Sequence, residues 1–146
     1  MKKSKEANAM TSLILGTFRL NGALLSAGNQ LTKPYDLTSA RWQVMGAIDI
    51  AGHALTVAQI ARRMGLTRQG VQRIVNDLDR LGMVTFNPNI DHKRAPLVSI
   101  TDTGNKVMIE IDKIQTAWVS ELCDGFSERQ IKQALKVIET VCERIK

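Results

Sequence analysis

A helix-break-helix pattern between residues 57 and 81 constrains the fold more than any other feature of the sequence. The stretch reads VAQIARRMGLTRQGVQRIVNDLDRL, with Gly65 and Leu66 at the break. Ala61, four residues before Gly65, is small enough to let two helices cross at close range. Gly65 accepts the positive φ that ends a helix, and Thr67 is placed to cap the helix that follows. The spacing predicts a helix-turn-helix.

The second helix of this pattern has two different faces at about 100° per residue. We expect its buried face to be formed by apolar side chains, namely Val71, Ile74, Val75, Leu78 and Leu81. The opposite face is polar and holds no carboxylate before Asp77. Arg can pair with guanine through two hydrogen bonds, and Gln or Asn with adenine, which favours a DNA-reading surface over an ordinary solvated face. The predicted DNA-binding residues of this helix are Thr67, Arg68, Gln69, Gln72, Arg73 and Asn76.

Hydrophobicity alternates with period two in residues 83–86 and again in residues 97–100, which predicts a two-stranded hairpin directly after the helix-turn-helix. Such a hairpin is a wing. Lys93 and Arg94 lie at its expected tip and are predicted to reach DNA phosphates or the narrow minor groove, where the negative potential is strongest. We expect Asp91, three residues before Arg94, to hold its guanidinium in place. The alternative is an ordinary charged turn.

Amphipathic helices are predicted on both sides of this centre. Residues 5–31 form one long helix of ~40 Å at 1.5 Å per residue, which is more than a small domain needs. A helix capped by Thr38 and closed by Gly52 follows, with Trp42, Val44, Met45, Ala47, Ile48 and Ile50 mostly interior. Residues 101–146 contain two further striped helices, the second with a capping box at Ser127 and Gln130. The surplus apolar faces suggest a second copy of the chain as partner.

The composition narrows the class of protein. A chain of 146 residues fits one domain, 1–146, and its net charge of +6 and pI near 9.6 suit a polyanionic partner. Residues 56–96 hold seven basic and three acidic residues. Cys123 and Cys142 have no CxxC spacing, and we expect them to be buried, reduced thiols. Because the sequence shows no leader and no membrane span, we expect a cytoplasmic protein. With two isolated histidines and no catalytic motif, we expect no enzyme, metal or cofactor.

The sequence resembles the MarR family of winged helix-turn-helix regulators over nearly its whole length. The matching segments are LTSARWQVM, VAQIARRMGLTRQGVQRIVNDLDRLGMV and NPNIDHKRAPLVSITDTG, the last with Asp91, Lys93 and Arg94 at the tip and Ile100 to Gly104 at the next helix start. Many relatives have two arginines in the wing where this chain has Lys93 and Arg94. Because Lys lacks a planar fork, Arg94 is the main wing residue.

The resemblance implies a mainly α (α+β) fold: a winged helix-turn-helix with a two-stranded wing at 38–100, flanked by dimerisation helices at 5–31 and 101–146. It implies a homodimer that binds double-stranded DNA at a pseudo-palindromic operator, here interpreted as a repressor. It also implies release by a small, often aromatic or phenolic, effector. Arg19, Arg41 and Trp42 are possible lining residues for that effector, or equally surface charges and core, and its site is left unknown.

Two other interpretations stay open. A winged helix can serve as a protein-protein interaction module without a DNA site of its own, and low-salt elution from heparin would distinguish it from a DNA binder. Thiol sensing by Cys123 or Cys142 is the other, although no basic cluster adjoins them in the sequence. The operator, the regulated genes and the sign of regulation do not follow from the residues.

Overall fold

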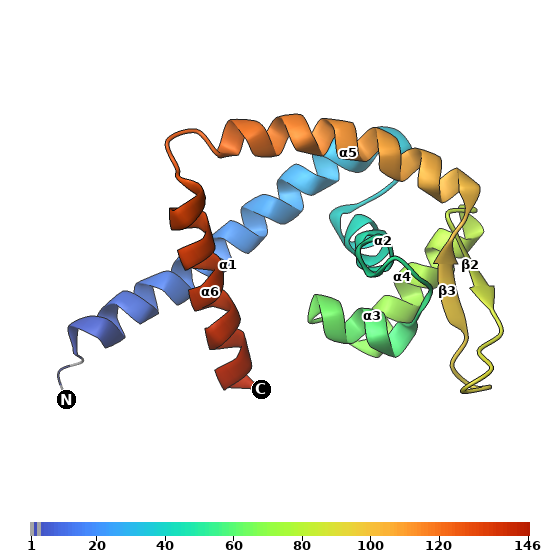
Figure 1. The fold of residues 1–146 in the computed structure, drawn as a ribbon, viewed down its shortest axis with the longest axis horizontal. Coiled ribbons are helices and arrows are strands. Elements are labelled where there is room, and N and C mark those ends of the chain that lie inside the picture. The colour runs from blue at the N-terminus through green and yellow to red at the C-terminus, as the bar shows by residue number, and fades with distance from the viewer. Residues whose placement is uncertain (1, 3) are drawn as a thin grey trace. The chain divides into compact units, whose positions relative to one another are not determined.

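The computed structural model describes residue 2 and residues 4–146 (Figure 1). The chain forms two compact units, one ending at Ile111 and the other spanning Asp112–Lys146. The elements, in order, are α1 (Lys5–Thr32), the 3-10 helix η1 (Lys33–Tyr35), α2 (Ser39–Ala51), β1 (Leu55–Thr56), α3 (Val57–Met64), α4 (Arg68–Arg80), β2 (Val84–Asn87), β3 (Leu97–Ile100), α5 (Asp102–Leu122) and α6 (Glu128–Ile145).

α1 is an unbroken helix of 28 residues. Its first turn is capped by Ser4, whose hydroxyl accepts a hydrogen bond from the backbone N–H of Ala7. Its last turns pack on the start of α2, where the Ser39 hydroxyl donates to the carbonyl of Leu25 at 2.6 Å. Gly28 is buried there, and a Cβ on it would lie 2.2 Å from the Ser39 hydroxyl oxygen. The glycine therefore permits the close approach that joins α1 to α2.

The helix-turn-helix is confirmed, with α3 and α4 packed on each other and on α2 (Figure 1). Thr56 and Gln59 form a capping box at the start of α3. Gly65 ends α3 with φ +65. Buried Ala61 is 4% exposed, as the close helix crossing requires. The break is therefore encoded locally by a cap, a small residue and a glycine.

The core lies between α2, α3, α4 and the sheet. Its largest fully buried side chains include Met45, Leu55, Ile60, Leu78 and Ile111. Trp42 is half-buried and packs against this core. Two predicted interior positions are wrong. Ile50 is 86% exposed in the last turn of α2, and Leu81 is 38% exposed at the C-cap of α4, one residue beyond the helix.

The wing is a three-stranded antiparallel sheet in the order β1-β3-β2. The predicted hairpin is confirmed, with β2 one residue later than expected and Val84 paired with Ile100. The sequence pattern does not predict the third strand, β1. It has only two residues, and Leu55 pairs with Val98. Thr56, the residue just before α3, pairs with Leu97, so β1 ties β3 of the wing to the start of α3.

The second unit contains the end of α5 and all of α6. The Ser127–Gln130 capping box is present at the start of α6. None of the residues of α6, all of which the structure describes, is buried. Cys123 and Cys142 are both exposed free thiols, so the prediction that they are buried is wrong. Leu122, next to Cys123, is 52% exposed, and Ile145, three residues after Cys142, is 77% exposed.

Candidate nucleic-acid interface

α4 is fixed by its cap and by its buried face. The Thr67 hydroxyl accepts a hydrogen bond from the backbone N–H of Gly70 at 3.0 Å, so the helix begins at Arg68. Val71, Val75 and Leu78 are fully buried against the core. Because these three side chains lock the rotation of α4 about its axis, the polar residues between them are held toward solvent.

The polar face of α4 is exposed as predicted. The side chains that share it are Arg68, Gln69, Gln72, Arg73 and Asn76. Gln72 Nε2 donates a hydrogen bond to Asn76 Oδ1 at 3.0 Å. Within the part of the chain that the structure describes, no carboxylate forms an ion pair with Arg68 or Arg73. The face therefore presents unpaired cations and amides, which suits hydrogen bonding to base edges and phosphates.

The wing tip is ordered by Asn89. Its Nδ2 donates to the carbonyl of Ala95 at 2.9 Å, and its Oδ1 accepts from the backbone N–H of Asp91 at 3.1 Å. Lys93 and Arg94 are exposed on this loop. The predicted Asp91–Arg94 ion pair is wrong, since neither residue has an ion-pair partner among the described residues. A side-chain amide that bridges the loop orders the tip in place of the carboxylate.

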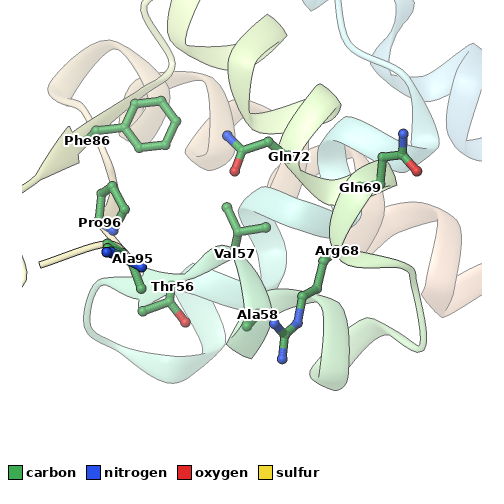
Figure 2. Close-up of a pocket in the computed structure, with 10 residues that line it drawn as sticks. Thr56, Val57, Ala58, Arg68, Gln69, Gln72, Phe86, Ala95 and Pro96 are labelled. Atoms are coloured by element: carbon green, nitrogen blue, oxygen red, sulfur yellow. The ribbon is translucent and has the colours of Figure 1, made fainter. Parts of the chain in front are cut away.

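A hollow of about 350 Å³ separates α4 from the wing. Figure 2 shows the side-chain amide of Gln72 pointing toward Phe86 of β2, with Val57 of α3 below and between them in the view. Four of the predicted DNA-binding residues line the hollow: Arg68, Gln69 and Gln72 of α4 and Arg94 of the wing. Thr67, Arg73, Asn76 and Lys93 do not line it. Its lining residues Arg68, Gln69 and Gln72 belong to the exposed polar face of α4.

Sequence reasoning misses several residues of this surface. Phe86 and Pro96 form the wing wall of the hollow, and Thr56 to Ala58 form its base at the start of α3. The period-two pattern predicts that Phe86 lies on a strand, but it does not show toward which neighbouring element its side chain points. From the sequence, Arg41 is a candidate only for an effector site, whereas its guanidinium contacts Asp77 of α4 at 3.4 Å. Arg41 and Asp77 are 36 residues apart, so no local pattern in the sequence predicts their contact.

Two other kinds of site were sought in the residues that the structure describes. These residues contain no group of three or more histidine, cysteine or carboxylate side chains that could hold a metal ion. Among the same residues, no helix is both long and apolar enough to cross a membrane. The polar face of α4 and the wing tip together form an exposed, positively charged surface. Its amide side chains lie on α4, and its ordered cationic loop is the wing tip.

Comparisons with known proteins agree with this geometry. The family model described as MarR family matches residues 35–95, which include α2, α3, α4 and the wing tip. The uncharacterized protein Rv2011c of Mycobacterium tuberculosis is 38% identical over 119 residues, covering 82% of each chain. The chain belongs to the MarR family.

Solved MarR-family structures have the same fold as this MarR-family chain. A mutant MarR from E. coli complexed with operator DNA has a TM-score of 0.78 and 20% identity, covering 94% of this chain and 99% of that one. CouR from Rhodococcus jostii RHA1, bound to p-coumaroyl-CoA, has a TM-score of 0.76 and 19% identity, covering 84% and 86%. The mostly helical winged-helix architecture of MarR regulators extends over nearly the entire chain.

Proposed function

We propose that this MarR-family regulator binds double-stranded DNA sequence-specifically as a homodimer on a pseudo-palindromic operator. The observation that carries the proposal is the exposed face of α4, which holds no carboxylate before Asp77, beside a cationic wing. Residues 38–100 would form the DNA-binding region, and residues 5–31 and 101–146 the dimerisation region. A regulator of this kind acts where the DNA is, in the cytoplasm, and needs no catalytic site or cofactor.

Each subunit would lay the N-terminal half of α4 in a major groove. Arg68, Gln69, Gln72 and Arg73 would contact base edges or adjacent phosphates, with Thr67 and Asn76 supporting them. The hollow beside Arg68 and Gln72 would then receive one wall of the groove, and Lys93 and Arg94 would reach the neighbouring minor groove. Repression follows if the operator overlaps a promoter, because a protein covering both grooves excludes other proteins from that DNA.

The homodimer is supported by apolar side chains that one chain leaves in water. In α1 they are Leu13, Ile14, Leu15, Phe18, Leu20, Leu24 and Leu25, and in α6 they are Ile131, Leu135, Val137 and Ile145. Contiguous exposed apolar residues mark interaction surfaces, and covering each large side chain contributes about 1.5–3 kcal/mol. A second copy offers the same helices and is the simplest partner.

Release by a small effector completes the proposal. Its support is that CouR, a structural neighbour, binds p-coumaroyl-CoA, which has an aromatic acyl group. An effector could act only by binding one spacing of the two α4 helices better than another. The structure of one chain gives no lining residues for such a site, and Arg19 and Trp42 are not assigned to it.

Selection of bound sequences from a random duplex library tests the proposal. The expected result is an inverted repeat whose half-sites are about one helical turn apart. The matched control is a chain carrying Gln69→Ala, Gln72→Ala and Arg73→Ala, which keeps the buried face of α4 and should enrich no repeat. If the wild-type chain enriches nothing at low salt and elutes from heparin at low salt, the fold serves protein partners instead.

A further inference from the structure

Asp77 is the first carboxylate of α4 and follows Arg73 by four residues. Side chains four apart on a helix are neighbours, so an Arg and an Asp at this spacing can form an ion pair. That pair would draw the Arg73 guanidinium away from a phosphate. It does not form: within the described residues, Arg73 has no ion-pair partner.

Asp77 is held from α2 instead. Arg41 Nη2 lies 3.4 Å from Asp77 Oδ2, and Arg41 Nη1 donates to the carbonyl oxygen of Asp36 at 3.0 Å. Asp36 is a left-handed residue with φ +55 at the end of η1, so the guanidinium bridges the α1–α2 connection and the recognition helix. The two side chains of the pair are only 28% and 25% exposed, which limits screening by water.

Asp77 has a second partner in Arg80, whose guanidinium contacts the other carboxylate oxygen. Arg80 belongs to the same helix as Asp77, and its side chain is 75% exposed. It therefore moves together with Asp77 and cannot anchor the carboxylate to the rest of the fold. Only Arg41 joins Asp77 to another element among the ion pairs of the described residues.

We infer that Arg41 is a positioning residue for DNA recognition: it holds the Asp77 carboxylate against α2 and so leaves Arg73 free to bind a DNA phosphate. This inference rests on the proposed function. Without Arg41, Asp77 keeps its contact with Arg80 but is no longer held against α2. Its other carboxylate oxygen can then pair with Arg73, and each subunit neutralises one DNA phosphate fewer. Since the cause is the charge of Asp77, removing that charge removes the need for Arg41.

The test measures affinity and its salt dependence for a duplex that the wild-type chain enriches from a random library. Arg41→Gln should weaken binding by about three- to tenfold, as expected for removal of one partly exposed charge pair, and should reduce the salt slope. Adding Asp77→Asn should restore affinity to within about twofold of Asp77→Asn alone. Arg73→Ala should cost much less in the Arg41→Gln background than in the wild type.

Arg80→Gln is the matched control, since it removes the same charge and another partner of Asp77 but should leave affinity within about twofold. An Arg41→Gln chain that binds like the wild type, or that stays weak after Asp77→Asn, overturns the inference. So does an equally weakened Arg80→Gln chain, which would reflect net charge alone. A wild-type chain that binds no DNA overturns the proposed function, and this inference with it.

Discussion

Gln72 is held by Asn76 through a hydrogen bond of 3.0 Å from Nε2 to Oδ1 on the exposed face of α4. An amide nitrogen has two hydrogens, so the second hydrogen and Oε1 of Gln72 stay available. These are the two groups that a glutamine uses to read adenine. Asn76 thus orients a base-reading side chain without blocking it. Because Gln72 is already partly ordered in the free protein, it loses less conformational entropy when DNA binds.

This relationship predicts that the two amides affect the same base pair. Gln72→Ala should cost about 1–3 kcal/mol of binding free energy and relax specificity at one operator position. Asn76→Ala should cost less, because Gln72 can still reach the base, but should relax the same position. Affinities for operators with single base-pair changes provide the measurement. If Asn76→Ala relaxes a different position, Asn76 reads a base of its own.

The wing prediction concerns Arg94. Arg94→Ala should weaken binding almost equally for all sequences and reduce the slope of log affinity against log salt by about 1 for each phosphate that is no longer neutralised. Lys93→Ala should have a smaller effect, because an ammonium lacks the planar fork that suits a narrow groove. Titrations at several salt concentrations measure both. Unchanged affinity and slope in Arg94→Ala would remove the wing from the interface.

The close packing around Gly104, at the base of the wing, predicts that a larger residue there lowers the free energy of unfolding. The Thr101 backbone N–H donates to the Met83 carbonyl at 3.0 Å, and the Thr101 hydroxyl accepts from the N–H of Gly104 at 3.1 Å. A Cβ on Gly104 would lie 2.1 Å from that carbonyl oxygen. Gly104→Ala should therefore lower the free energy of unfolding by about 1–3 kcal/mol or more, since backbone must move.

The control for Gly104→Ala is Gly46→Ala in α2, where an added Cβ meets no atom within 4 Å. That change should raise the free energy of unfolding by roughly 0.5–1 kcal/mol through helix propensity. Chemical denaturation at one protein concentration measures both variants. Equal effects of the two substitutions would contradict the close approach at Gly104.

Phe18 tests the dimerisation helices. It lies on α1 with 70% of its surface exposed, which in a dimer would be covered. Phe18→Glu should shift the chain toward monomer in sedimentation experiments, because a carboxylate in an apolar interface is costly to desolvate. Ile50→Glu is the control, since Ile50 is 86% exposed on α2 and should stay in water. A fully dimeric Phe18→Glu chain would place the interface elsewhere.

Local signals in the sequence predict most of the fold. Thr38, Thr67 and Ser127 all cap the helices that the sequence predicts for them, because a cap depends only on residues within one turn. The apolar stripe of α4 is correct at Val71, Val75 and Leu78 for the same reason. These features determine the rotation of α4 and hence its polar face.

Features that depend on distant partners could not be predicted. Ile50 is apolar but 86% exposed, although the next residue, Ala51, packs against the core, so an apolar residue near the edge of the stripe does not show whether a neighbouring element covers it. β1 has two residues, too few for an alternating pattern, and is defined only by pairing with β3. The Arg41–Asp77 pair joins residues 36 apart. At the wing tip, Asn89 forms hydrogen bonds within the loop, and the expected Asp91–Arg94 pair does not form.

The most direct test of the central claim is to measure, by sedimentation, the mass of the complex that the chain forms with a duplex carrying the selected sequence. The account predicts two chains per duplex, bound together in one step, on an inverted repeat with half-sites about one helical turn apart. A single chain bound to a single half-site with full affinity would contradict the claim that a dimer places one α4 helix in each of two major grooves.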